Sequence, residues 1–199
     1  TMQIWDYSSF TAKNGDTFGS CCSLDDVYDA RRVAESLDIP FYVVNFEETF
    51  QKEVIDRFCD DYLAGRTPNP CVWCNQQLKF ERLLQRACEL EADALANGHY
   101  ARLVSEGEGW ALRKGLDAGK DQSYFLFGLP QSTLETLVFP LGNLTKSEVR
   151  AAGRRLRVPN ADKPESQELC FVPDGGVGEF INRQGSPTTF GNIVDPAGT

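Results

Sequence analysis

The feature that most constrains the fold is an alternation of short apolar runs with longer segments of helical period. Apolar and aromatic runs occupy residues 41–46 and 93–97, and helical patterns fill residues 47–63 and 75–90. Short β-branched and aromatic runs of this kind are typical of strands buried on both faces, and helices that separate such strands form crossovers. The chain is therefore predicted to be an α/β protein with a parallel sheet.

Further elements follow from local patterns. They are the end of a strand at 1–7, a helix at 24–39 capped by Ser23, a hairpin formed by 101–104 and 110–114, and a helix at 145–158 that opens on a Thr-x-x-Glu capping box. After Pro173 the sequence is rich in glycine and proline, and the helical pattern weakens. We therefore expect a first domain at 1–173, and a linker with the start of a smaller domain at 174–199.

Composition narrows the classes of function. The chain has 199 residues with 20 Lys+Arg and 29 Asp+Glu, and the net charge of −9 argues against a nonspecific nucleic-acid coat. The excess is local, because residues 1–65 carry 5 basic and 13 acidic side chains and the remainder carries 15 and 16. No run reaches the roughly 18 apolar residues of a membrane span, and no signal pattern is present. A soluble, cytoplasmic protein is expected.

The seven cysteines and the single histidine bound the chemistry. An odd cysteine count without a signal peptide favours thiols used for chemistry, metal binding or packing over a disulfide framework. Cys71 and Cys74 form a Cys-x-x-Cys pair after a proline-rich turn, and a helix N-terminus there favours a thiolate at Cys74. A half zinc site and simple packing are the alternatives. Cys170, Cys59 and Cys88 are each compatible with packing alone, and Cys21 and Cys22 cannot be placed.

Three polar clusters are candidate binding residues. Gly98 and His99 follow a predicted strand, where α/β sheets bind ligands and where a glycine permits close approach, although a lone histidine is more often structural. Residues 120–122 offer donors and acceptors suited to a base or a phosphate. Four cations are spaced along one face of the helix at 145–158 and could bind phosphates or form a solvated face: Lys146, Arg150, Arg154 and Arg157.

Five segments, read together and in order, resemble the bacterial tRNA-specific 2-thiouridylases. They are GRTPNPCVWCN at 65–75, NGHY at 97–100, KDQSYFL at 120–126, FPLG at 139–142 and SQELCF at 166–171. The resemblance implies a Rossmann-like fold of the ATP-pyrophosphatase type. It also implies an enzyme that uses ATP with Mg²⁺ to adenylate the 2-carbonyl oxygen of the wobble uridine of tRNA, and then replaces that oxygen with sulfur.

The resemblance also implies roles for individual residues. Cys170 would carry a persulfide received from a sulfur carrier protein, and Cys74 would be the partner nucleophile, which forms a Cys74–Cys170 disulfide as the sulfur leaves. The remaining assignments are a pocket for the flipped target base at Asn69, Pro70 and Cys71, tRNA contacts at His99, Lys120, Asp121 and Gln122, and nucleotide contacts at Met2 and Gly98.

Two departures from the family pattern shape the expectations. The phosphate-binding Ser-Gly-Gly-x-Asp-Ser loop would lie upstream of Met2, and β-rich domains would follow residue 199, so the chain is expected to be a fragment that is inactive alone. Cys71 stands where many members have aspartate. Cys71, Cys74 and Cys170 are thus an alternative ligand set for an iron–sulfur cluster.

Two rival functions stay open at the level of sequence. One is a catalytically silent tRNA-binding or partner-binding fragment whose cysteines are structural or bind zinc. The other is a nitrogen-transferring relative of the same ATP-pyrophosphatase group, against which the paired Cys74 and Cys170 argue.

Overall fold

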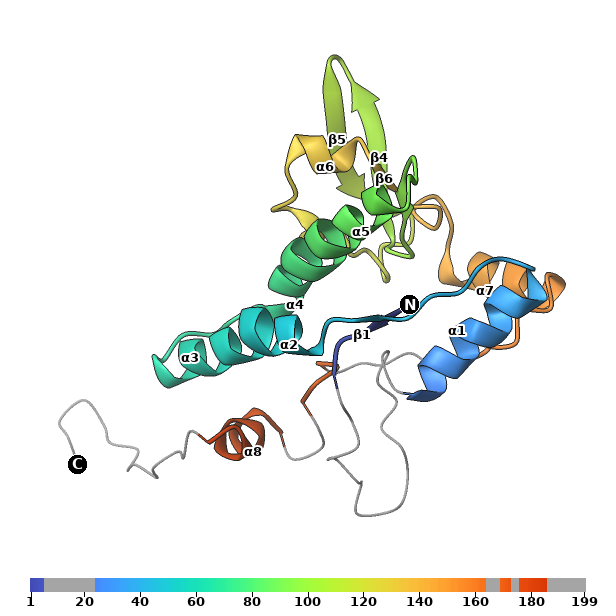
Figure 1. The fold of residues 1–199 in the computed structure, drawn as a ribbon. Coiled ribbons are helices and arrows are strands. Elements are labelled where there is room, and N and C mark those ends of the chain that lie inside the picture. Colours follow the sequence, from blue (N-terminus) through green and yellow to red (C-terminus); the bar gives the residue numbers. More distant parts are fainter. Residues whose placement is uncertain (6–23, 164–168, 173–175, 186–199) are drawn as a thin grey trace, which may run out of the picture.

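The computed structural model describes residues 1–5, 24–163, 169–172 and 176–185 (Figure 1). Its strands form three pairs within these ranges. β1 (Met2–Gln3) pairs in parallel with β2 (Val44–Asn45), and β3 (Leu95–Ala96) pairs in parallel with β6 (Leu137–Val138). The third pair is an antiparallel hairpin of β4 (Ala101–Glu106) and β5 (Gly109–Lys114).

Two long helical segments follow β2 along the chain and precede β3. The first is continuous through α2 (Glu47–Phe50), a π-helical stretch (Gln51–Asp56) and α3 (Arg57–Leu63). The second is continuous through α4 (Pro70–Trp73), a longer π-helical stretch (Cys74–Arg82) and α5 (Leu83–Glu89). Figure 1 shows the second segment running from the first one toward the hairpin.

Shorter helices complete the described chain. They are α1 (Leu24–Ser36), a 3₁₀ turn (Ser123–Leu126), α6 (Gln131–Leu134), α7 (Lys146–Arg155) and α8 (Gly176–Arg183). None of the helices in the described ranges is long and apolar enough to cross a membrane.

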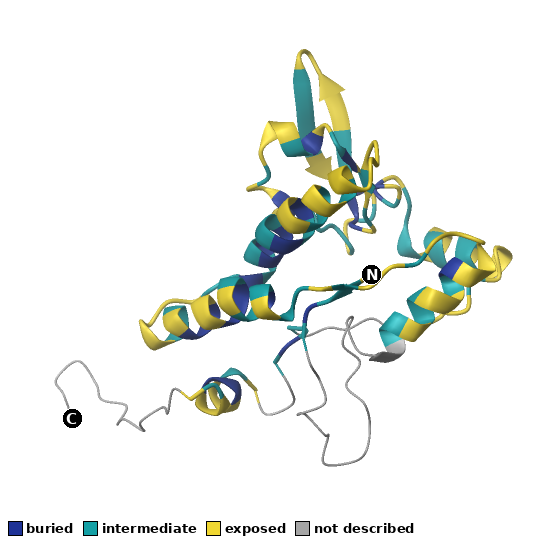
Figure 2. Cartoon of the chain, in the orientation of Figure 1, coloured by how far each residue is buried: buried dark blue, intermediate teal, exposed yellow. Residues whose placement is uncertain are grey.

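Two clusters of buried side chains hold these elements together (Figure 2). The first cluster joins β1, the first helical segment, the start of the second segment and the C-terminal part of the described chain: Ile4, Phe50, Val54, Ile55, Phe58, Cys59, Cys74, Leu78, Phe171, Phe180 and Ile181. The second cluster lies under the hairpin and β6: Phe80, Ala101, Leu126, Leu137 and Phe139. The second helical segment contributes to both clusters, so it connects them mechanically.

Helix α8 belongs to the first cluster although it lies after the predicted domain boundary. The Phe180 side chain is fully buried, and its ring centroid lies 5.3 Å from that of Phe171 and 6.2 Å from those of Phe58 and Trp5. Burial of this ring and of Ile181 accounts for a helix in a segment that has glycine at 176 and 178. The division at 173 and 174 itself stays a prediction.

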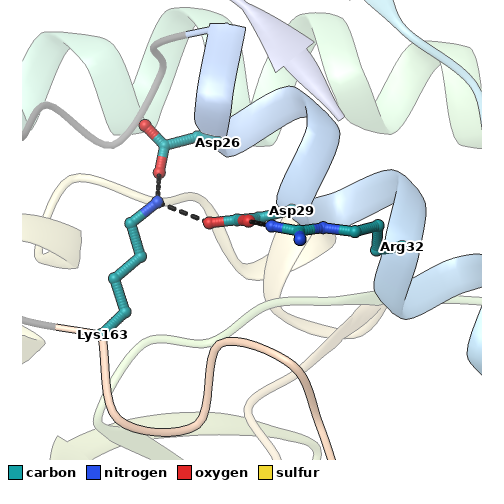
Figure 3. Close-up of polar contacts among 4 residues, drawn as sticks. All are labelled: Asp26, Asp29, Arg32 and Lys163. Carbon is teal, nitrogen blue, oxygen red and sulfur yellow. Dashed lines mark hydrogen bonds and ion pairs between the residues drawn. The ribbon is translucent and has the colours of Figure 1, made fainter. Parts of the chain in front are cut away.

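An ion-pair group fixes α1 to the segment that follows α7 (Figure 3). The Lys163 Nζ donates to Asp26 Oδ1 at 2.6 Å and to Asp29 Oδ2 at 2.7 Å. Asp29 also pairs with Arg32 one turn along the same helix. The Lys163 hydrogen bond, followed by that of Arg32, lowers the pKa of the Asp29 carboxyl. These contacts bridge parts of the chain that are distant in sequence.

Several sequence predictions are confirmed and others are wrong. The hairpin, the helix over 47–63 and the capping box are confirmed, since Thr145 Oγ1 accepts from the Glu148 amide while the Glu148 carboxylate accepts from the Thr145 amide. The strand predicted over 41–46 is only two residues long and is not buried on both faces, because Tyr42 and Val43 are 62% and 43% exposed. The predicted Ser23 cap and residues 8–20 lie outside the described residues.

Candidate active site

The Cys-x-x-Cys pair lies where the second helical segment begins. Pro70 occupies the first helical position, where its missing N–H costs no hydrogen bond, and Cys71 follows it. Cys74 is one turn further in, where the π-helical stretch starts, and is 8% exposed. The helix dipole acts mainly within the first turn, and Cys74 lies just after it, so the thiolate expected at Cys74 stays a prediction.

Cys170 is brought to the same part of the molecule by its neighbour. Phe171 is 3% exposed, and its ring centroid lies 5.6 Å from that of Phe50 and 5.1 Å from that of Phe58. Cys170 itself is half-buried and packs against the first cluster, of which Cys74 is a buried member. The two cysteines named by the sequence therefore share one cluster. No disulfide joins cysteines within the described residues.

The other described cysteines differ in environment. Cys59 is buried in the first cluster, as predicted for a packing residue, and burial raises the pKa of its thiol, with Asp56 and Asp60 adding to the shift. Cys88 is exposed, so its prediction as a packing residue is wrong; it lies on the outer face of α5. Cys21 and Cys22 lie outside the described residues.

The three-cysteine ligand set is not formed. Within the described ranges, which include Cys71, Cys74 and Cys170, no group of three or more His, Cys, Asp or Glu side chains is placed to hold a metal ion. The iron–sulfur alternative and the zinc alternative therefore have no ligand set among these residues.

His99 lies inside the protein rather than on its surface. Its side chain is 6% exposed, and its ring centroid is 5.7 Å from that of Phe80 and 6.0 Å from that of Phe139. Burial, with a smaller contribution from the charge of Lys79, lowers the pKa of His99 from 6.5 to about 3. Its Nδ1 has no hydrogen-bond partner among the described residues. The imidazole is thus neutral at physiological pH and is shielded from direct contact with a ligand at the surface.

The two residues predicted to contact a nucleotide are placed by different strands. Met2 lies in β1, half-buried against the first cluster, and Gly98 follows β3 and is exposed. A Cβ at position 98 would meet only Leu141 Cδ1 at 3.8 Å, which is an ordinary contact. Packing therefore does not require a glycine here, and the nucleotide contacts of Met2 and Gly98 stay predictions.

The loop at 120–122 is joined to the segment that carries His99. The Gln122 side-chain Oε1 accepts a hydrogen bond from the Tyr100 backbone amide at 3.1 Å. The Gln122 backbone amide donates to the Tyr100 carbonyl at 3.0 Å. Asp121 Oδ1 accepts from the amides of Gly115 at 2.8 Å and Ser123 at 3.2 Å. The structure thus brings the two predicted tRNA-contact segments together. The Asp121 and Gln122 side chains are used to hold this arrangement.

Asn75 is a polar residue at the site whose role sequence analysis missed. It follows Cys74, is 3% exposed, and its Nδ2 donates to the Phe125 carbonyl at 3.4 Å. This contact ties the cysteine-bearing helix to the 3₁₀ turn after the 120–122 loop. Its Oδ1 has no partner among the described residues. The available signal was an amide side chain placed on the buried face of a helix.

The predicted cationic stripe on α7 is wrong for Arg157, and Arg154 stays on the helix but is paired with a carboxylate. Arg154 Nε donates to Asp162 Oδ1 at 2.9 Å, so its charge is neutralised by a neighbour. Arg157 lies after the helix ends at Arg155 and has φ +56°, which takes it off the helical face. The helix is shorter than the sequence pattern suggests.

The site can now be set beside known proteins. A family model described as the tRNA methyl transferase HUP domain matches residues 1–174. The chain belongs to this family. The match confirms the α/β fold class of the ATP-pyrophosphatase type, with a Rossmann-like arrangement of parallel strands. It also supports the resemblance drawn from the five motifs.

Curated relatives agree with the family. The chain is 58% identical to the tRNA-specific 2-thiouridylase MnmA of Geobacter metallireducens, with 100% of this chain and 55% of the relative covered. It is 59% identical to the protein of the same name in Geotalea uraniireducens, with 100% and 53% covered, and 48% identical to that of Carboxydothermus hydrogenoformans, with 100% and 54% covered. The chain spans about half the length of these relatives.

Proposed function

We propose that the protein containing this chain replaces the 2-oxygen of the wobble uridine of tRNA with sulfur and consumes ATP. The proposal is supported by family membership and by relatives named tRNA-specific 2-thiouridylase. The single observation that carries it in this chain is the packing of Cys74 and Cys170 against one cluster. Two thiols far apart in sequence that share a site are what sulfur transfer between cysteines requires.

The proposed reaction begins with activation of the 2-oxygen of the uracil and ends with a disulfide between Cys74 and Cys170. ATP with Mg²⁺, when bound, would transfer its adenylyl group to the 2-oxygen with release of pyrophosphate, which turns that oxygen into a leaving group. Cys74 thiolate attacks the Cys170 Sγ of a Cys170 persulfide, and the terminal sulfur leaves as hydrosulfide. That sulfur adds to C2 of the uracil, and AMP departs with the oxygen. The Cys74 sulfur is oxidised as the terminal sulfur is reduced, and the Cys170 sulfur stays at the same oxidation level, so an external thiol reductant must then reduce the Cys74–Cys170 disulfide before the next cycle.

We propose that the remaining predicted residues bind the nucleotide, the target base and the tRNA. Met2 and Gly98 would contact the adenine nucleotide, and Asn69, Pro70 and Cys71 would line the pocket for the flipped base. The tRNA would be met by the joined segments that contain four residues: His99, Lys120, Asp121 and Gln122. Because His99 is buried and the Asp121 and Gln122 side chains hydrogen-bond backbone, we expect these three to act mainly by shaping the surface that RNA meets.

The partners and setting are also part of the proposal. A sulfur carrier protein would load Cys170, and the reaction would take place in the cytoplasm, where tRNA is modified. We further propose that residues 1–173 form the nucleotide-binding and catalytic unit and that 174–199 lead into a smaller domain. Residues 1–199 alone are expected not to adenylate tRNA. Release of AMP by this exact polypeptide with substrate tRNA would overturn that expectation.

The experiment uses the full-length protein and the substrate tRNA. Cys74→Ser and Cys170→Ser should each abolish formation of 2-thiouridine, which is measured by the retardation of thiolated tRNA in a gel containing immobilised mercury. Pyrophosphate release should persist in both variants, because adenylation precedes sulfur transfer. Cys88→Ser, at an exposed site on α5, is the matched control and should keep full activity. Unchanged thiolation in both cysteine variants would refute the roles given to Cys74 and Cys170, whereas absence of thiolation by the unsubstituted protein would favour a silent binding protein with structural cysteines.

A further inference from the structure

We infer that α8 is a positioning element of the thiol site: the ring of Phe180, acting through Phe171, holds Cys170 against the cluster that contains Cys74. The chemical meaning of this inference rests on the proposed function. The contacts that carry it are independent of that function. They make Phe180 a positioning residue rather than a catalytic one, because it acts on Cys170 only through its neighbour.

Cys170 lies in a short turn of the chain. The Val172 amide donates to the Leu169 carbonyl at 3.1 Å, so residues 169–172 form a tight turn with Cys170 and Phe171 at its centre. Cys170 is half-buried, whereas Phe171 is 3% exposed. The position of the thiol is therefore set by the anchoring of the residue that follows it in the turn.

Phe171 is anchored by aromatic rings. Its ring is enclosed by rings from two separate elements. Phe50 and Phe58 come from the first helical segment, at centroid distances of 5.6 and 5.1 Å, and Phe180 comes from α8, at 5.3 Å. If the α8 ring is removed, one side of this enclosure is open. The turn then keeps contacts to the first helical segment alone.

Helix α8 is itself fixed to the rest of the chain. Its Phe180 also contacts the rings of Trp5 and Phe58, and Ile181 is 4% exposed. Just after the helix, Gln184 Oε1 accepts from Gln51 Nε2 at 3.4 Å. The helix is thus held to β1 and to the first helical segment at once. Since the family model matches residues 1–174, the element that seats Cys170 lies beyond the matched segment.

A purely structural role for Phe180 predicts a different outcome. In that case, removal of its ring would lower global stability as any large core truncation does, with no selective effect on Cys170. A positioning role predicts local opening around Cys170 under conditions in which the rest of the protein stays folded. Local opening and global stability can be measured separately, so the two roles are distinguishable.

The test compares Phe180→Ala with Leu134→Ala in the reduced protein under native conditions. Leu134 is 4% exposed in α6, which Figure 1 shows beside the hairpin and far from α8, so it is a matched buried truncation. The readout is the rate of alkylation of Cys170 by iodoacetamide, followed by mass spectrometry with exposed Cys88 as the internal reference. Because three ring contacts are lost, Phe180→Ala should raise the Cys170 rate at least about tenfold.

Leu134→Ala should leave that rate within about twofold, and Phe180→Leu, which keeps an apolar side chain, should restore most of the protection. Equal Cys170 rates in Phe180→Ala and in the unsubstituted protein would overturn the inference. So would an equal acceleration by Leu134→Ala. If Phe180→Ala does not fold, Phe180→Val, whose side chain is too small to replace the ring, is compared with the unsubstituted protein instead, and an unchanged rate is the refuting result.

A second readout connects the inference to catalysis. In the full-length protein, Phe180→Ala should lower kcat for thiolation while the KM for tRNA and the single-turnover rate of pyrophosphate release stay unchanged. A rise in KM with unchanged kcat would contradict a role in placing Cys170. The alkylation assay needs neither tRNA nor ATP. Selective exposure of Cys170 would therefore support the positioning role even if the proposed thiolation activity failed, and the two failures can be told apart.

Discussion

The burial of His99 predicts a pH dependence of stability that can be assigned to one residue. His99 is the only histidine of the chain, and burial lowers the pKa of its imidazole from 6.5 to about 3. An unfolded chain takes up a proton at this residue as the pH falls through about 6.5, whereas the folded chain stays neutral there until about pH 3. Protonation therefore favours the unfolded state, and the folded protein loses stability as the pH falls through this window.

The size of the effect follows from the same two values. With pKa values of 6.5 unfolded and about 3 folded, lowering the pH from 7.5 to 5 should reduce the free energy of unfolding by about 2 kcal/mol. Ordinary aspartate and glutamate side chains have pKa values near 4, so most of their titration lies below this range. A loss of this size is a large fraction of the stability of a typical domain.

The assay is urea denaturation followed by tryptophan fluorescence at several pH values from 7.5 to 5. The matched variant is His99→Gln, which cannot titrate, and its free energy of unfolding should change by less than about 0.5 kcal/mol over the same range. The absolute stability of the variant is irrelevant, because the slope carries the information. An equal slope in both proteins would refute the reasoning, as would an imidazole proton resonance of the folded protein that titrates near pH 6.5.

Three further predictions concern stability and can be measured by the same denaturation assay. Gly142→Ala would place a Cβ 1.9 Å from the Ala101 carbonyl oxygen and should lower the free energy of unfolding by at least about 2 kcal/mol. As a control, a Cβ at Gly178 meets nothing within 4 Å, so Gly178→Ala should be neutral or stabilising. Equal effects of the two substitutions would contradict the packing around Gly142. Lys163→Met should cost about 1 kcal/mol, because the Lys163 side chain is 38% exposed while its partners Asp26 and Asp29 are 19% and 14% exposed, and the loss should shrink in 1 M salt. Thr145→Ala removes a capping box and should cost about 1 kcal/mol, while an unchanged midpoint would show that the cap is energetically idle.

Sequence patterns predicted those elements whose cause is local. The helix over 47–63 and the hairpin after residue 100 follow from period and turn residues, which act within a few positions. The extent of the strand at Val44–Asn45 depends on its pairing with β1, which the local run of apolar residues does not contain. Helix α8 was missed for a related reason. Its two glycines indicate a turn, and only burial of Phe180 among rings distant in sequence explains why it is helical.

The candidate site shows the same division between local and distant causes. Two prolines and a predicted helix start marked the Cys-x-x-Cys turn in the sequence. The resemblance to a known family then indicated Cys170 as the partner of Cys74. No local pattern explains why Asn75 is buried or why His99 lies between two rings. His99 is placed by packing against Phe80 and Phe139, and Asn75 is tied by its hydrogen bond to the turn that contains Phe125, and both contacts form only in three dimensions.

The unequal exposure of the two cysteines supports the proposed division of their roles. A sulfur carrier protein must reach the thiol that it loads, and Cys170, half-buried on a tight turn, is more accessible than Cys74, which is 8% exposed. A nucleophile that acts only after loading benefits from shielding, because a buried thiol is slower to react with oxidants in solution. We therefore expect a persulfide donor to place sulfur on Cys170 before Cys74. Mass spectrometry of the protein after brief exposure to such a donor measures this order, and sulfur found first on Cys74 would reverse the two assignments.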